Sequence, residues 1–97
     1  MYNIIYIIIQ FRWLFWSQTS WASYDRPMTE IYRSNTMGTN ITAIVHRDLG
    51  IVLALTIDYT RSRLYWSDTF HKNIESSNLD GSNRIIVLNT DVSSTRL

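Results

Sequence analysis

Four side chains have the chemistry that acid–base catalysis or metal binding needs: the carboxylates of Asp58 and Asp68 and the imidazoles of His46 and His71. A carboxylate pair can act as general acid and base, but no positioned nucleophile or phosphate-binding glycine loop accompanies these two aspartates. The histidines stand 25 residues apart, without the short spacing of a metal site. We therefore expect a noncatalytic chain without metal or cofactor, in which the aspartates cap strands and turns.

The composition excludes further kinds of site and partner. The chain has 97 residues and no cysteine, so it cannot hold a thiol nucleophile, a thiolate zinc site or an iron–sulfur cluster. Nine Lys and Arg against eight Asp and Glu leave a net charge of only +1, which is too small and too dispersed for a nucleic-acid interface. Three glycines and one proline are few for a free-standing all-β domain, and they indicate an incomplete fold.

Short strands must position these residues. Runs rich in β-branched and aromatic residues are separated by turn-length gaps, and no stretch has the 3.6-residue apolar period of a helix. Asp80 and Gly81 mark the clearest turn, because Asp can hydrogen-bond its own backbone and Gly accepts a positive φ. In the second half of the chain the predicted strands are residues 52–57, 63–68, 73–78 and 84–88.

An internal repeat organises the chain. The two copies are offset by 50 residues at the first matching segment but by only 43 residues between Gly38 and Gly81, so the first copy has an insertion. We place the insertion at residues 18–28, where Ser, Thr, Asp25, Arg26 and Pro27 favour an exposed loop. Four-stranded units at such a period are typical of β-propeller blades. The matching segments are Leu14-Phe15-Trp16-Ser17 with Leu64-Tyr65-Trp66-Ser67, Ile31-Tyr32-Arg33-Ser34-Asn35 with Ile74-Glu75-Ser76-Ser77-Asn78, and Gly38-Thr39-Asn40 with Gly81-Ser82-Asn83.

The second copy, with Leu64-Tyr65-Trp66-Ser67-Asp68 followed by Leu79-Asp80-Gly81-Ser82, resembles the YWTD motif, which is the class B repeat of low-density lipoprotein receptors. The resemblance implies an all-β fold of two four-stranded antiparallel blades from an incomplete six-bladed β-propeller. The first blade, residues 4–48, would be divergent and carry the loop insertion at 18–28, and the second, residues 49–95, would be typical. The resemblance implies that Tyr65, Trp66, Ser67 and Asp68 hold the blades in register. The full set of structural-motif residues comprises Phe15, Trp16, Gly38, Asp58, Tyr65, Trp66, Ser67, Asp68, Asp80, Gly81 and Arg84.

The first copy departs from the motif at four positions. Glutamine can accept a hydrogen bond but carries no charge, and methionine cannot set up a turn as aspartate does. Either this blade is divergent or its start is not the true one, and both interpretations stay open. Gln18, Met37, Ile41 and Ile8 stand where the second copy has Asp68, Asp80, Arg84 and Asp58.

The apolar run at residues 4–9 has two interpretations. It ends before Gln10 and Arg12, which leaves it well short of the roughly 20 residues of a membrane-spanning helix. Its dense isoleucine favours a buried strand, which is the interpretation we prefer. Alternatively, residues 1–22 form a signal peptide, since Ser20 and Ala22 have the spacing of a cleavage site.

The resemblance also implies a function and a location for the chain. The chain would be a noncatalytic segment of an endocytic or signalling receptor of the low-density lipoprotein receptor-related type, outside the plasma membrane or secreted, and would contribute to binding or release of a protein ligand. Its partners would be the remaining blades and the EGF-like modules of a longer parent chain. Because two blades leave apolar faces uncovered, the isolated fragment is expected to self-associate. The alternatives are a nidogen-like or growth-factor-precursor-like scaffold and a lactonase-type propeller enzyme.

Three polar residues, Asn40, His46 and His71, are candidates for glycosylation or pH sensing. Asn40-Ile41-Thr42 is the one N-glycosylation sequon of the chain, and it lies at a predicted turn. His46 and His71 fall in predicted loops, where an imidazole charges on acidification. They are therefore either pH sensors for ligand release or ordinary solvated residues.

Overall fold

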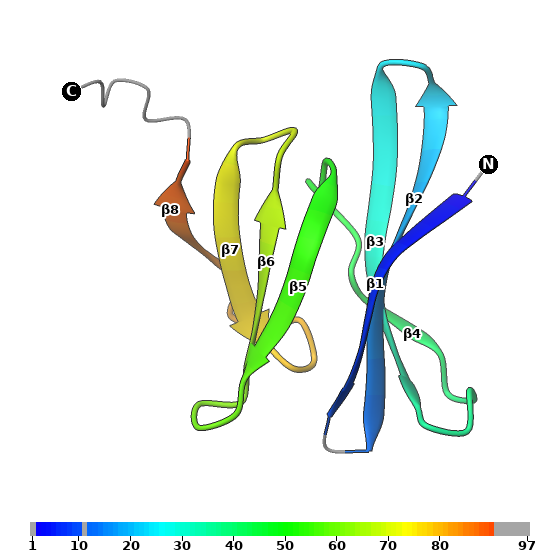
Figure 1. The fold of residues 1–97 in the computed structure, drawn as a ribbon, viewed down its shortest axis with the longest axis vertical. Helices are drawn as coiled ribbons and strands as arrows, with labels where there is room; N and C mark the ends of the chain where they lie inside the picture. Colours follow the sequence, from blue (N-terminus) through cyan, green and yellow to red (C-terminus); the bar gives the residue numbers. More distant parts are fainter. Residues whose placement is uncertain (1, 11, 91–97) are drawn as a thin grey trace.

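The structure is a computed structural model that describes residues 2–10 and 12–90. These residues form two four-stranded antiparallel sheets, each with its strands in sequence order, and Figure 1 shows the sheets side by side. The predicted all-β fold of two four-stranded units is thus confirmed. The first sheet holds β1 (Tyr2–Gln10), β2 (Trp13–Ser23), β3 (Arg26–Asn35) and β4 (Thr42–Val45), and the second holds β5 (Val52–Asp58), β6 (Arg63–Asp68), β7 (Asn73–Asn78) and β8 (Ile85–Asn89).

Residues 18–28 do not form the predicted loop. They extend the β2–β3 hairpin, whose register runs from Trp13↔Asn35 to Ser23↔Arg26 around the turn at residues 24–25, and this hairpin rises above the rest of the sheet in Figure 1. The prediction was wrong because it relied on polar composition, whereas Ser and Thr also fit a strand when a partner strand satisfies their hydrogen-bonding groups. The buried hydroxyls of Thr19 and Thr29, for example, are hydrogen-bonded across the hairpin at 2.8 Å.

The apolar run at residues 4–9 lies within β1, which pairs with β2. The preferred interpretation of this run as a strand is confirmed, whereas the expected burial of its isoleucines falls on side chains outside the described part of the structure. Within residues 2–10 and 12–90 there is no helix with the length and apolar character needed to cross a bilayer.

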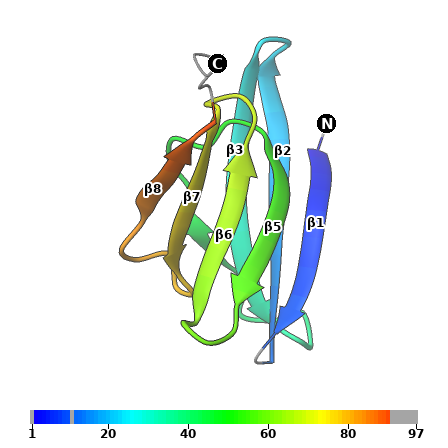
Figure 2. The same ribbon diagram turned by 60° about the vertical axis from the view of Figure 1, so that its left-hand side comes forward.

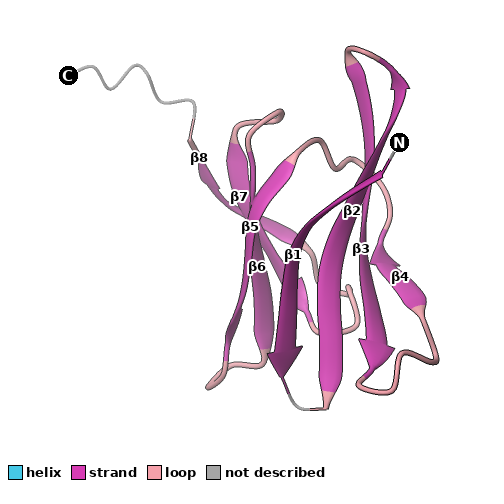
Figure 3. Cartoon of the chain, turned by 45° about the vertical axis from the view of Figure 1, so that its right-hand side comes forward, coloured by secondary structure: helices cyan, strands magenta, loops and turns pink. Residues whose placement is uncertain are grey.

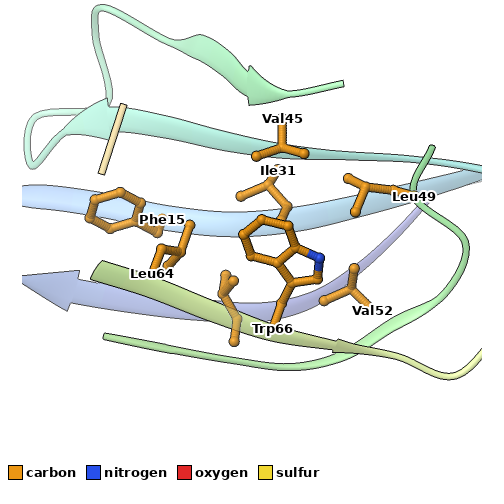
Figure 4. Packing of buried hydrophobic residues seen from close by; sticks show 8 residues of the cluster. Phe15, Ile31, Val45, Leu49, Val52, Leu64 and Trp66 are labelled. Carbon is orange, nitrogen blue, oxygen red and sulfur yellow. The ribbon is translucent and has the colours of Figure 1, made fainter. Parts of the chain in front are cut away.

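The hydrophobic core lies between the two sheets, which face each other in Figure 2. Strand alternation explains which residues enter it: β2 buries every second residue from Phe15 to Thr19, and β6 buries every second residue from Leu64 to Asp68. We call this contact between the sheets the seam. Figure 4 shows Trp66 in the middle of the buried cluster, which comprises Phe15, Ile31, Val45, Leu49, Val52, Leu55, Leu64 and Trp66.

The turn before the last strand has the same geometry in both sheets, which supports the repeat alignment. In each sheet an Asn amide bonds the carbonyl four residues on, at 3.0 Å from Asn35 to Thr39 and at 2.8 Å from Asn78 to Ser82. The first sheet forms this turn without an aspartate, because the Asn35 carboxamide oxygen accepts the amides of Met37 and Thr39 at 2.9 and 3.0 Å. The loss of Asp at Met37 is therefore compensated locally.

The glycines of these turns differ in their surroundings. Both have a positive φ, +81° at Gly38 and +89° at Gly81. A Cβ at Gly81 would lie 1.9 Å from the carbonyl oxygen of Ile44, whereas a Cβ at Gly38 would meet nothing within 4 Å. Gly81 thus permits the second sheet to approach the backbone of β4 across the seam.

Replacing Gly81 by Ala is expected to destabilise the fold more than replacing Gly38 by Ala. Both variants bear the cost of a side chain at positive φ, about 1–2 kcal/mol, but only Gly81→Ala also forces two backbones apart, for roughly 1–3 kcal/mol more. Urea unfolding followed by tryptophan fluorescence at equal, low protein concentration measures the difference. Equal midpoints for the two variants would contradict the close approach at the seam.

Candidate functional site

Three charged residues of the second half of the chain, Asp68, Glu75 and Arg84, lie around the segment that joins the sheets, residues 46–51, here called the linker. The Asp68 side chain is fully buried at the end of β6. Its carboxylate accepts the linker amides of Gly50 at 2.7 Å and Ile51 at 3.1 Å. It also accepts the amides of Phe70 at 3.0 Å and His71 at 2.9 Å from the turn after β6. One carboxylate therefore joins the linker to the β6–β7 turn.

These hydrogen bonds decide the ionisation of Asp68. Burial raises the pKa of its carboxyl, but the amides of His71, Gly50 and Ile51 favour the carboxylate more strongly and hold the pKa below its ordinary value. The Nδ1 atom of His71 lies 3.0 Å from the carboxylate, and the imidazole is 39% exposed. Asp68 is therefore an anion in the folded chain at neutral pH.

Arg84 holds the other half of the linker. Its guanidinium donates to the carbonyl of Asp48 at 2.9 Å and to that of Arg47. It is fixed by Glu75, with Nε to Oε1 at 2.7 Å and Nη2 to Oε2 at 3.0 Å, and it lies 5.7 Å from the centre of the Trp66 ring. This bidentate pair is geometrically specific and mostly buried, so the arginine has little freedom to leave the linker.

Gly50 and Thr29 make a further contact at the linker, and neither was predicted from the sequence. The Thr29 hydroxyl, from the first sheet, donates to the carbonyl of Gly50. A Cβ at Gly50 would lie 2.4 Å from Cβ of Phe70 and 2.7 Å from Oδ1 of Asp68. Only glycine fits there, because a side chain would displace the carboxylate. Glu75 was also missed, although an acidic residue on one predicted strand and Arg84 at the start of the next were a usable signal of an ion pair.

Asp58 is the last residue of β5, just before a turn, and Asp80 lies in an exposed turn. Asp58 accepts the hydroxyl and amide of Thr60 at 2.8 and 3.0 Å and pairs with Arg61 at 2.9 Å. These bonds lower its pKa, and bonds from Ser82 lower that of Asp80. In the β5–β6 register Asp58 stands opposite Arg63, whereas Asp68 stands opposite Val52 at the other end of the pair. The two carboxylates therefore do not form an acid–base pair.

The aromatic motif residues are divided between the faces of the sheets. Phe15 and Trp66 are buried in the seam. Tyr65 and Ser67 are half-buried on the opposite face of the second sheet. On the first sheet Trp16 faces away from the seam and stacks on Tyr32 with ring centroids 5.5 Å apart. Of these motif residues, only Phe15 and Trp66 therefore come together in the seam.

The other two candidate residues, Asn40 and His46, take no part in the contacts between the second sheet and the linker. Asn40 is exposed in the turn before β4, two residues after Gly38, with φ of +55°. His46 is exposed at the start of the linker. The described residues contain no group of three or more His, Cys, Asp or Glu side chains that could hold a metal ion. The geometry around the linker is that of a structural junction.

Comparison with known proteins finds receptor relatives of the chain, although no family model matches it. Over 77 residues, 79% of the chain, it is 48% identical to the vitellogenin receptor of Solenopsis invicta. Over 57 residues, 59% of the chain, it is 42% identical to low-density lipoprotein receptor-related protein 5 of Homo sapiens. The chain belongs to the low-density lipoprotein receptor class B repeat family. It spans only 4% of the length of either relative.

A solved structure agrees on the fold of these class B repeats. A chain of the nidogen/laminin complex superposes with a TM-score of 0.74 at 22% identity, over 90% of this chain and 31% of that one. Its identity is low, so it supports the fold alone. The expectations of a noncatalytic and extracellular segment agree with the receptor relatives.

Replacing Asp68 by Asn is expected to lower the free energy of unfolding by roughly 2–4 kcal/mol, because the negative charge is lost and at least one backbone amide is left without an acceptor. If the carboxamide oxygen takes the place of Oδ1, it keeps the amides of Ile51, Phe70 and His71 and leaves that of Gly50 facing an NH2 group. Urea unfolding followed by tryptophan fluorescence measures the loss. Asp58→Asn, at the end of β5 and away from the linker, is the matched control and should lose less. A change at Asp68 no larger than that of the control would contradict its role at the linker.

The same carboxylate predicts a pH dependence of stability. Since the folded pKa of Asp68 lies below its unfolded value of about 3.9, its contribution is present above that value and is lost as the pH falls through the folded pKa. Asp58 and Asp80 act in the same direction. The acid-side decline in stability should therefore become shallower in Asp68→Asn without disappearing.

Proposed function

We propose that the chain is a pair of adjacent blades, residues 4–48 and 49–95, in the noncatalytic extracellular β-propeller of a receptor of the low-density lipoprotein receptor-related type. The observation that carries this proposal is the linker junction, where the charged groups of Asp68, Glu75 and Arg84 are engaged with backbone groups or with one another. The match to receptors by name supports the receptor rather than the scaffold alternative.

We further propose that the partners include the remaining blades and the EGF-like modules of a longer parent chain. Phe15 and Ser17 of the first sheet are buried by the second sheet. Their equivalents in the repeat, Tyr65 and Ser67, lie on a face of the second sheet that none of the described strands covers. A further blade on that face would repeat the seam.

The parent protein is expected to bind a protein ligand through its ectodomain, and the name of the 48% identical relative makes vitellogenin the first ligand to test. The parent transcript should encode further class B repeats, Cys-rich modules and a membrane-spanning segment. Vitellogenin binding to the purified ectodomain is measured at neutral and acidic pH. A transcript without a membrane segment, or an ectodomain that binds no vitellogenin, would favour the scaffold alternative.

If His46 and His71 sense pH, the double variant His46→Gln with His71→Gln should retain ligand at acidic pH. An unchanged pH profile of ligand binding would exclude the two histidines as pH sensors.

The isolated chain is expected to self-associate, because Ile85, Ile86, Val87 and Leu88 of β8 are each about half exposed in addition to the uncovered blade face. Analytical ultracentrifugation across micromolar concentrations tests this expectation. A monomer that unfolds cooperatively at all concentrations would contradict it.

Asn40 is expected to carry an N-linked glycan when the chain is secreted from eukaryotic cells. Its exposed turn leaves the carboxamide accessible. Digestion with an N-glycosidase should increase electrophoretic mobility, and Thr42→Ala, which removes the sequon but keeps Asn40, should show the faster mobility without digestion. Identical mobility of the two chains before digestion would exclude the site.

A further inference from the structure

The first sheet leaves part of one strand edge uncovered. In the second sheet β8 pairs with β7 as far as Asn73, the first residue of that strand. In the first sheet β4 pairs only with Ile31–Arg33 of β3, and the chain then departs at His46. Residues 26–30 of β3 therefore have β2 on one side and none of the described strands on the other, as Figure 3 shows beside the short β4. This edge is roughly 17 Å long at the usual rise of a strand.

A cavity of about 460 Å³ lies at the uncovered edge. The extended hairpin forms one wall and the linker forms the other. Pro27 within the strand fits this arrangement, because proline is tolerated where one side of a strand has no ladder partner. The lining residues are Gln18, Ser20, Pro27, Met28, Thr29, Glu30, Tyr32, His46, Asp48 and Leu49.

The lining combines negative charge with apolar surface. Glu30 and Asp48 contribute carboxylates from opposite walls, and the described lining contains no Lys or Arg. The Tyr32 hydroxyl donates to the Glu30 carboxylate and orients it. Met28 is 58% exposed beside them. The charge and the open edge together indicate a cationic, strand-forming occupant.

We propose that this edge binds an extended peptide segment of a protein partner in which basic residues alternate with apolar ones. The segment pairs with the backbone of residues 26–30, in the place that a longer β4 would occupy. Its Lys or Arg side chains meet Glu30 and Asp48, and its apolar side chains contact Met28. The proposal goes beyond the receptor function, because it needs only the extended hairpin and the linker.

The test uses the full chain and two short synthetic peptides, one alternating valine with lysine and the other alternating valine with glutamate. Fluorescence anisotropy should show binding of the lysine peptide and about tenfold weaker binding of the glutamate peptide. The double variant Glu30→Gln with Asp48→Asn should weaken lysine-peptide binding by about fivefold or more. Asp48→Asn suits the positive φ of 54° at this position.

Asp25→Asn is the matched control, because Asp25 lies at the tip of the same hairpin and outside the cavity lining. It should leave lysine-peptide binding unchanged, and a peptide N-methylated at alternate residues should bind poorly because it cannot pair with an edge. Circular dichroism establishes that each variant is folded. Absence of lysine-peptide binding at millimolar concentration, equal weakening by Asp25→Asn, or equal binding of the N-methylated peptide would each overturn the proposal.

Discussion

The buried carboxylate of Asp68 is the constraint on which the arrangement of the two sheets depends. Taking a carboxylate out of water is costly unless hydrogen bonds replace its hydration. Here the replacement comes from four backbone amides, two in the linker and two in the β6–β7 turn. The anion therefore fixes the path of the chain between the sheets, and with it the face that each sheet presents to the seam.

Other parts of the junction follow from this requirement. The carboxylate leaves no room for a side chain at Gly50. Arg84, which Glu75 holds in place, then donates to the linker carbonyls of Arg47 and Asp48, so that both kinds of backbone group find partners. Apolar packing around Trp66 supplies the contact area, while the polar groups determine the register in which the sheets meet. Together these contacts fix the position of one sheet relative to the other.

The two repeats use different chemistry for the same strand order. The second has Asp68, Glu75 and Arg84, whereas the equivalent positions of the first have Gln18, Tyr32 and Ile41. The first sheet therefore lacks the charged residues that would hold a linker of its own, and it presents the Trp16–Tyr32 stack on that face instead. It also has the longer hairpin and the uncovered edge. The divergence of the first repeat thus changes a surface and leaves the fold intact.

Alternation of residue types was enough to predict most of the fold. The strands at residues 63–68 and 73–78 have the predicted bounds, since period-two patterning and turn residues are local properties of the chain. Residues 18–28 were predicted wrongly, because Ser and Thr are compatible with either a loop or a strand until a partner strand is present. The sequence by itself determined the β class, the repeat and the turns at Gly38 and Gly81. Only the tertiary structure decided that Asp68 binds the linker, that Gly50 must lack a side chain and that residues 26–30 have an open edge. Each of those depends on groups distant in the chain coming within a few ångströms.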